Sequence, residues 1–521
     1  MRAIDYFDKT ADLYPHRIAI IDGERRHSYA EVRQFSVRIA RAMRASGVER
    51  EERAAIYSHN HAAVLFCMLG ILRSGAAWVP VNFRNAIDAN VEFLNYSQTT
   101  WLFYHSRFRD QVEEMRRRAP CLRHLICMDA PPDDSSSLAR FMELQNASPE
   151  FNGSDEYGNL HQMMGLVPTG GTTGPARGVR VTNLAWGTMT ELASRYWASD
   201  TTPVCLCTAP LSHAAGVVAF TIFAQGGANV VLPGFDAGQV LQAIAHHRAT
   251  HMFLPPTALY SLLAHPEIGK HDYSSMRVFL LAGSPVSPDK LKKGVEVFGP
   301  CMCQSYGQTE APMLLTWLDQ RTAAAAAAGD HPERLASCGR PTAAVRVAIM
   351  DDSGRILPAR ERGEIVARGT LVTGGYHNLP EATAEIRRYG WHHTGDVGYM
   401  DEDGYVYIVD RKKDMIVSGG FNVFCSEVEA GIMALPQVAE CAVIGVPDQK
   451  WGEAVKALVV VRSGESLTED QVIAHCKAKL GSVKSPKSVE FWTEIPKTPA
   501  GKLDRKTMRK SFWASADRQV H

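Results

Sequence analysis

Residues 166–180 read LVPTGGTTGPARGVR, a run with four glycines and three threonines that ends on two arginines. Glycine lets backbone N–H groups turn inward at little steric cost, and threonine hydroxyls and arginine add donors and charge. The run is therefore typical of a loop that wraps a polyphosphate. A flexible surface loop is the alternative when glycines and threonines are taken alone.

Two common nucleotide-binding patterns do not account for this loop. A Walker P-loop needs GxxxxGK followed by Ser or Thr, and neither Gly269-Lys270 nor Gly501-Lys502 is followed by one. The loop also lacks the GxGxxG fingerprint of dinucleotide-binding domains. A Walker ATPase and a Rossmann dehydrogenase are therefore disfavoured.

Strand-like and helical runs alternate on both sides of the loop. Residues 53–58 and 60–75 begin the pattern, and it returns between 229 and 307. This rhythm predicts an α/β fold with largely parallel sheets, which bind ligands at the C-terminal ends of their strands. From about 340 to 409, short β runs predict a small antiparallel, β-barrel-like unit, and an α+β pattern follows beyond 415.

The domain boundary is predicted at the charged cluster DRKKD, residues 410–414. It divides the 521 residues into a large N-terminal domain, 1–409, and a small α+β C-terminal domain, 410–521. A run of six alanines at 323–328 is interpreted as a surface connector.

Composition excludes several classes of protein. With 56 basic and 56 acidic residues, no global field attracts nucleic acid or an anionic membrane. The longest apolar stretch, Ala62–Leu72, is shorter than the roughly 20 residues of a membrane span, and the acidic N-terminal segment does not suit a signal peptide. We expect a cytoplasmic protein. The spacing of Cys205/Cys207 and Cys301/Cys303 favours packing over a zinc site.

Five motifs occur in a fixed order: TGGTTGPARG at 169–178, YGQTE at 306–310, HHTGD at 392–396, DRKKD at 410–414 and PKTPAGK at 496–502. Over about residues 5–510, the sequence therefore resembles the adenylate-forming superfamily of acyl-CoA synthetases, firefly-type luciferases and non-ribosomal adenylation domains. The resemblance implies that a carboxylate attacks the α-phosphate of ATP, giving an acyl adenylate and pyrophosphate, and that a thiol then displaces AMP. Such a site needs positive charge, oriented donors and Mg²⁺.

The resemblance assigns the phosphate contacts to the loop and to YGQTE. Glu310 would hold Mg²⁺, and Thr309 would reach the α-phosphate. The residues that would close over the β- and γ-phosphates are Thr169, Gly170, Gly171, Thr172, Thr173, Gly174 and Arg177.

The nucleoside is assigned to three other segments. Tyr306 would stack on adenine, with Gly283 and Ser284 lining the other side. Asp396 would accept both ribose hydroxyls, a task suited to the two oxygens of a carboxylate, with Arg411 assisting. Singly, Asp396 could be a helix cap and Tyr306 a core residue, but five motifs in register outweigh those readings.

The loop departs from the family pattern in three places. Gly170 stands where serine is usual, Ala176 where proline is usual and Arg177 where lysine is usual. Arginine keeps the charge but presents a planar fork. We expect the protein to bind ATP still, with an altered affinity for ATP or an altered release of pyrophosphate.

The acyl pocket is predicted around PLSHAAGVVAF. His213 matches the position that flanks the acyl carboxylate, and Ala214 follows where amino-acid-activating relatives have an aspartate. An amino acid substrate is therefore disfavoured, and an aromatic or medium- to long-chain aliphatic acid is favoured. The pocket is expected to include Ala214, Ala215, Gly216, Pro312, Met313 and Leu314.

The resemblance also implies rotation of the C-terminal domain between the two reaction steps, with the pivot at Lys413. In one orientation Lys502 would bridge the substrate carboxylate and the α-phosphate. In the other, Gly419 and Gly420 would let a pantetheine thiol pass, with Trp451 beside it. Without the flanking motifs, an ordinary linker and a solvated lysine would explain the same residues.

The acceptor is expected to be free coenzyme A, because no carrier-protein motif follows in this sequence. Transfer to an amine or a carrier protein is the alternative, and a non-catalytic ligand sensor that retained the fold is a third hypothesis. The oligomeric state stays open, with a homodimer as one option.

Overall fold

The computed structural model describes residues 1–144, 159–169, 177–212, 214–419, 421–498 and 503–513. The chain divides into two compact units. The first holds most of the chain up to Val347 together with Ala367–His392, and the second holds Ala348–Val366 and the chain from His393 onward. The boundary predicted at 409/410 falls inside the second unit. Because that boundary marks a pivot of movement, which compactness does not measure, it stays a prediction.

A nine-stranded sheet in the first unit has a parallel centre and antiparallel pairs at both ends. Its order is β15-β14-β13-β12-β11-β9-β10-β1-β2. Its strands are β1 (Ile18–Asp22), β2 (Arg25–Ser28), β9 (Val204–Cys207), β10 (Ala228–Val231), β11 (His251–Leu254), β12 (Val278–Leu281), β13 (Met302–Gln308), β14 (Ala311–Leu318) and β15 (Arg340–Pro341).

A six-stranded sheet, also in the first unit, has the order β6-β5-β3-β4-β7-β8. Its pairs are parallel except for the last, β7 with β8, which flanks the phosphate loop. Its strands are β3 (Arg53–Tyr57), β4 (Ala77–Pro80), β5 (Trp101–Tyr104), β6 (His124–Cys127), β7 (Met163–Pro168) and β8 (Gly178–Thr182). The predicted α/β fold with largely parallel sheets is confirmed.

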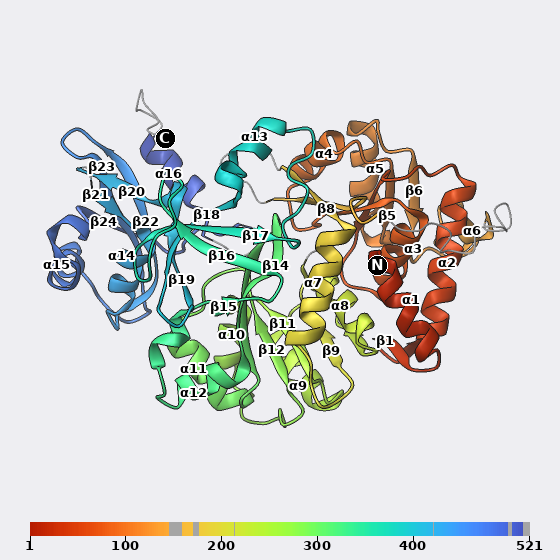
Figure 1. Ribbon diagram of the computed structural model, residues 1–521, viewed down its shortest axis with the longest axis horizontal. Helices are drawn as coiled ribbons and strands as arrows, with labels where there is room; N and C mark the ends of the chain where they lie inside the picture. The colour runs from red at the N-terminus through yellow and green to blue at the C-terminus, as the bar shows by residue number, and fades with distance from the viewer. Residues whose placement is uncertain (145–158, 170–176, 213, 420, 499–502, 514–521) are drawn as a thin grey trace. The chain divides into compact units, whose positions relative to one another are not determined.

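Helices cover these sheets. In Figure 1, α1, α2 and α3 group together near the N-terminus, and α9 to α12 follow one another along the nine-stranded sheet. The helices of the first unit are α1 (Ala3–Leu13), α2 (Tyr29–Ala45), α3 (Ala62–Ser74), α4 (Ile87–Tyr96), α5 (Arg109–Arg118), α6 (Leu138–Glu143), α7 (Asn183–Tyr196), α8 (Ala214–Ala224), α9 (Ala237–His246), α10 (Pro256–Leu263), α11 (Pro288–Phe298), α12 (Gln320–Ala327) and α13 (Pro380–Glu385).

The longest apolar stretch of the sequence forms α3, and every residue of this helix is buried. A helix that is apolar on all sides belongs inside a large protein or a membrane. Here it packs on α2, whose start is fixed by a capping box between Ser28 and Glu31. Within the described ranges, no helix has both the length and the apolar character that a bilayer crossing requires.

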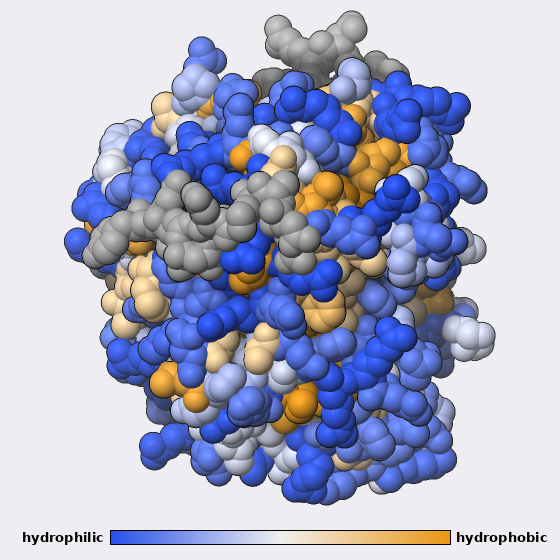
Figure 2. Space-filling view, turned by 90° about the vertical axis from the view of Figure 1, so that its right-hand side faces the viewer, coloured by the Kyte–Doolittle hydropathy of each residue, from blue (hydrophilic) through white to orange (hydrophobic). Residues whose placement is uncertain are grey.

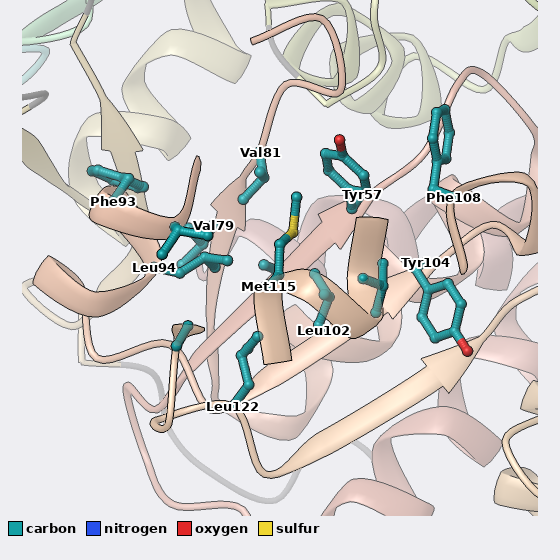
Figure 3. Packing of buried hydrophobic residues seen from close by; sticks show 14 of the residues in the cluster. Tyr57, Val79, Val81, Phe93, Leu94, Leu102, Tyr104, Phe108, Met115 and Leu122 are labelled. Carbon is teal, nitrogen blue, oxygen red and sulfur yellow. The ribbon is translucent and has the colours of Figure 1, made fainter. Parts of the chain in front are cut away.

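A hydrophobic core fills the space between the six-stranded sheet and the helices α4 and α5 (Figure 3). Strand residues on one side meet helix residues on the other, as the alternation of strand and helix predicts. The labelled members of the cluster are Tyr57, Val79, Val81, Phe93, Leu94, Leu102, Tyr104, Phe108, Met115 and Leu122. This core includes residues of β3, β4, β5 and β7, and β7 leads into the loop rich in glycine and threonine.

In the ranges that the structure describes, the second unit combines two sheets with three α-helices. Most of a four-stranded sheet, β16-β17-β18-β19, belongs to it, and a second sheet runs β21-β20-β23-β22 with β24 beside β23. The elements are β16 (Val345–Met350), β17 (Gly363–Gly369), β18 (His392–Met400), β19 (Val406–Arg411), β20 (Ile416–Ser418), β21 (Phe421–Val423), α14 (Cys425–Met433), β22 (Val438–Asp448), β23 (Gly452–Val461), α15 (Glu469–Lys484), β24 (Ser488–Phe491) and α16 (Arg505–Trp513).

One expectation of local structure is wrong. The alanine run at 323–328 is not a connector, because most of it lies in α12, where Ala323 and Ala326 are buried. Asp319 caps this helix by accepting from the backbone N–H of Thr322.

The face of the first unit that carries α2 and α6 is largely hydrophilic, with hydrophobic residues in separate groups (Figure 2).

Candidate active site

The candidate residues fall into two groups, one in each compact unit. In the first unit, β12 and β13 run parallel, with Leu281 opposite Gln304. The segment that follows β12, with Gly283 and Ser284, therefore emerges at the same sheet edge as Tyr306 near the end of β13. Tyr306 is buried and Ser284 is exposed. The arrangement is compatible with an adenine site, and these roles stay predictions.

The YGQTE motif forms the tight connection between β13 and β14. Gln308 pairs with Ala311, so Thr309 and Glu310 make the turn. A Cβ added at Gly307 would lie 2.5 Å from the backbone nitrogen of Met313, so only glycine fits there. Met313 itself has a φ of 56°. This close backbone contact fixes the turn that presents Glu310.

Two contacts hold Glu310 from a segment far along the chain. The phenol of Tyr376 donates to its Oε1 at 2.6 Å, and the N–H of Thr373 donates to its carbonyl at 2.9 Å. Burial, and then the carboxylate of Glu310, raise the pKa of Tyr376, so the phenol keeps its proton. Nearby, Nε2 of His392 lies 3.0 Å from Oε1 of Gln308.

The base of the phosphate loop is closed by its two end residues. The carbonyl of Arg177 accepts from the backbone N–H of Thr169 at 2.8 Å and from its hydroxyl at 3.3 Å. The guanidinium carbon of Arg177 lies 5.4 Å from the centre of the Tyr376 ring. The remaining predicted loop residues lie outside the described residues: Gly170, Gly171, Thr172, Thr173, Gly174 and Ala176.

Tyr376 belongs to a short segment that runs along β8. Arg180 donates to the carbonyl of Gly375 at 2.8 Å, and Gly374 donates back to Arg180 at 2.9 Å. His377 then donates to Gly178 at 2.8 Å. Sequence reasoning missed Tyr376: the only signal is a tyrosine after two glycines in a turn-rich segment, and that pattern does not reveal its partner.

In the second unit, Asp396 and Arg411 are cross-strand partners on β18 and β19. Nε of Arg411 lies 3.6 Å from Oδ1 of Asp396, and the hydroxyl of Thr394 accepts from the N–H of Asp396 at 3.1 Å. Asp396 is buried, whereas the Arg411 side chain is 41% exposed. The structure thus brings together the two residues predicted for the ribose, and their role stays a prediction.

A buried carboxylate next to this pair was not predicted. Glu364 on β17 accepts from the N–H of Gly395 at 3.1 Å, and its other oxygen lies 3.1 Å from Nδ1 of His393 and 3.3 Å from Nζ of Lys412. Burial alone would raise the pKa of Glu364. The contact with His393 and the charge of Lys412 outweigh burial and hold that pKa below its usual value.

The remaining predicted residues of the second unit lie around β20 and β21. Lys413 is the middle residue of the short 3₁₀ turn η5 (Lys412–Asp414). Gly419 donates its N–H to the carbonyl of Trp451 at 2.8 Å, and a Cβ on Gly419 would lie 2.6 Å from the indole ring. Gly419 and Trp451 are therefore in contact, and their place beside a pantetheine passage stays a prediction. Besides the loop residues named above, three more predicted residues of the chain lie outside the described ranges: His213, Gly420 and Lys502.

Of the predicted acyl pocket, the described part is apolar. The sequence of α8, AAGVVAFTIFA, contains no charged residue, and Ala215 is buried. Leu314 on β14 is buried as well, and Pro312 and Met313 are partly buried. This composition suits an uncharged acyl group.

Comparison with known proteins gives a consistent result. The AMP-binding enzyme family matches residues 7–377, and the AMP-binding enzyme C-terminal domain matches residues 427–502. The first match contains TGGTTGPARG and YGQTE and the second contains PKTPAGK, whereas HHTGD and DRKKD lie in the stretch between the two matches.

Three similar proteins illustrate the range. A medium/long-chain-fatty-acid–CoA ligase of Mycobacterium tuberculosis is 43% identical over 367 residues. These residues are 69% of this chain and 63% of that protein, so the match spans less than two thirds of the relative's own length. The feruloyl-CoA synthase of Amycolatopsis sp is 35% identical over 512 residues, 97% of this chain and 98% of that protein. The solved structure of the amide bond synthetase McbA from Marinactinospora thermotolerans has a TM-score of 0.87 at 28% identity, covering 98% of this chain and 100% of that one.

Proposed function

Because this chain belongs to the AMP-binding enzyme family and is an AMP-forming acyl-CoA synthetase, we propose that it joins an apolar carboxylic acid to coenzyme A. The acid is aromatic or a medium- to long-chain aliphatic one. The observation that carries this substrate class is the uncharged sequence of α8 together with buried Leu314. Relatives named for feruloyl-CoA and for medium- to long-chain fatty acids support both forms of the acid.

The first step joins the acid to AMP. A carboxylate oxygen attacks the α-phosphorus of ATP, and the bond to the bridging oxygen of pyrophosphate breaks. Arg177 and the hydroxyl of Thr169, at the base of the loop, stabilise the departing phosphates, while Thr309 donates to the α-phosphate. These donors offset the repulsion between two anions, which is the main barrier to the step.

Glu310 is the residue that would hold Mg²⁺. In the part of the chain that the structure describes, no group of three or more His, Cys, Asp or Glu could hold a metal by itself. Mg²⁺ needs no such group, because proteins commonly bind it through one or two carboxylates and the substrate phosphates. When bound, the ion neutralises charge on the leaving pyrophosphate.

The second step is displacement of AMP by the thiol of coenzyme A, which loses its proton as the thioester forms. We assign Gly419 and Trp451 to the pantetheine passage and Lys502 to the first step only. Asp396 and Arg411 bind the ribose in both steps, because ATP and the acyl adenylate share that sugar. Lys413 is the proposed pivot, with the boundary at 409/410.

An amine acceptor is the second candidate function. The likeness to an amide bond synthetase over 98% of this chain favours it, because one fold can support reactions with different acceptors. We propose a cytoplasmic location, where ATP and coenzyme A are both available. A homodimer stays a prediction that sedimentation velocity would test.

A panel of acids tests the function. Aromatic acids and aliphatic acids of increasing length would be supplied with ATP, Mg²⁺ and either coenzyme A or an amine, and products identified by mass spectrometry. Thioester and AMP from an apolar acid support the proposal, whereas amide without thioester supports the second candidate. Absence of acid-dependent exchange of labelled pyrophosphate into ATP across the panel would contradict both.

A further inference from the structure

We propose that Tyr376 is a positioning residue that fixes the carboxylate of Glu310 for binding of magnesium–ATP, and that its ring connects Glu310 to the end of the phosphate loop through Arg177. The inference rests on the proposed function of Glu310. It concerns residues of the first unit alone, and each contact that carries it is between described residues.

The hydrogen bond itself gives the orientation. The Tyr376 hydroxyl donates to Oε1 of Glu310 at 2.6 Å. A carboxylate that accepts one such bond on one oxygen keeps its second oxygen and its full negative charge for a cation. Among the described residues Glu310 forms no salt bridge, so a neutral donor orients it without cancelling that charge. Donors of this kind, placed behind a metal-binding carboxylate, set its orientation and its affinity.

Tyr376 is itself held from two sides. Its backbone N–H donates to the hydroxyl of Thr383 at 2.9 Å, at the start of α13. The flanking residues are fastened to β8 by backbone hydrogen bonds, and the Tyr96 hydroxyl donates to the carbonyl of His377. A side chain whose backbone is fixed in this way loses little further entropy when its hydroxyl makes a hydrogen bond.

The ring of Tyr376 meets the last residue of the loop. The Arg177 guanidinium lies 5.4 Å from the ring centre, within the range of a cation–π contact. A planar guanidinium stacks on an aromatic face better than an ammonium. This contact gives a physical reason for arginine at the position where lysine is usual, because one tyrosine then fixes both the loop end and Glu310.

A pair of tyrosine-to-phenylalanine variants tests the proposal. Tyr376→Phe keeps the ring beneath Arg177 and removes only the hydroxyl. Tyr57→Phe is the matched control, because the hydroxyl of the core residue Tyr57 also donates a 2.6 Å hydrogen bond, to Oε1 of the exposed Gln111. Isothermal titration calorimetry would measure ATP binding with Mg²⁺ and with EDTA, in the absence of any acid.

We expect Tyr376→Phe to weaken magnesium-dependent ATP binding by about tenfold, the lower range for loss of a residue that orients a metal ligand. Binding in EDTA should change less than about twofold, and Tyr57→Phe should bind like wild type in both conditions. Thr383→Val, which removes the acceptor of the Tyr376 backbone N–H, should give the same selective effect at smaller size. Thermal unfolding of each variant confirms that it is folded.

The outcomes separate this inference from the proposed function. Equal weakening with and without Mg²⁺, or magnesium-dependent binding by Tyr376→Phe that equals wild type, would overturn the role of Tyr376 alone. Wild-type protein that binds ATP no better with Mg²⁺ than with EDTA would overturn the role of Glu310 and this inference together.

Discussion

The two compact units hold their carboxylates in opposite ways. In the first, Glu310 sits in a backbone-fixed turn and meets a neutral phenol. In the second, Asp396 lies beside a guanidinium, and Glu364 lies beside an ammonium and an imidazole. A carboxylate oriented by a neutral donor keeps its charge for a cation, whereas one paired with a cation is better suited to binding hydroxyl groups or to fixing structure. The difference is in keeping with the proposed roles, a metal ligand for Glu310 and a ribose ligand for Asp396.

The largest expected effect concerns a cation of the second unit. Lys502→Ala should lower acid-dependent pyrophosphate exchange by about 10²- to 10³-fold, because one preorganised charge on the reacting groups is lost. Thioester formation from a synthetic acyl adenylate should stay near the wild-type rate. Equal loss of both steps would show that the cation serves the whole reaction, and the pivot at Lys413 would lose its support.

Gly307→Ala tests whether the backbone fixes Glu310. The added Cβ would press on the backbone of Met313, so the free energy of unfolding should fall by about 1–3 kcal/mol. Gly234→Ala is the control, because a Cβ there meets nothing within 4 Å. Urea unfolding followed by tryptophan fluorescence gives both values. If Gly307→Ala were as stable as the control, the turn would be looser than the contact indicates.

Glu364→Gln tests the charged network of the second unit. The folded-state pKa of Glu364 is lowered, so its contribution to stability is present above the unfolded pKa and is lost as pH falls through the folded one. At pH 7 the variant should lose about 1–2 kcal/mol of unfolding free energy. The loss should shrink toward zero below about pH 4. Urea unfolding at several pH values measures this, with Glu361→Gln at an exposed position as the control. A loss that does not depend on pH would contradict the charge-based explanation.

Arg411→Lys should have the smallest effect. It keeps the charge beside Asp396 but loses the planar fork, and the side chain is 41% exposed. We expect a rise of about two- to fivefold in the KM for ATP, which higher salt makes smaller, and an unchanged kcat. An effect on kcat, measured by steady-state kinetics, would mean that Arg411 does more than help to bind the ribose.

Local patterns predicted the parts of the molecule that depend on neighbouring residues. The alternation of strands and helices predicted largely parallel sheets, and the resemblance carried by the motifs predicted that Asp396 and Arg411 act together. The assignment of strands to sheets could not be predicted. β1 and β2 join the nine-stranded sheet although the six strands that follow them build the other one.

The missed residues depend on contacts across long stretches of sequence. Tyr376 meets Glu310, which lies 66 residues earlier, through a segment with no regular periodicity. In the sequence, Glu364 cannot be distinguished from an ordinary strand residue. Only the folded chain brings it next to Lys412 and His393. The prediction for the alanine run was wrong although the relevant information is local. Helix propensity and the Asp319 cap were sufficient to predict α12.

The position of β1 has a consequence for how the chain is made. Its Ile20 pairs with Asn229 of β10, so this strand finds its parallel partner only after about 200 further residues have been synthesised. At about 5–20 residues per second, the ribosome needs roughly 10–40 s to deliver that partner. During this interval one side of β1 offers unpaired backbone groups, a target for chaperones and for pairing between nascent chains. Slower translation before β10 should therefore increase aggregation of the newborn protein.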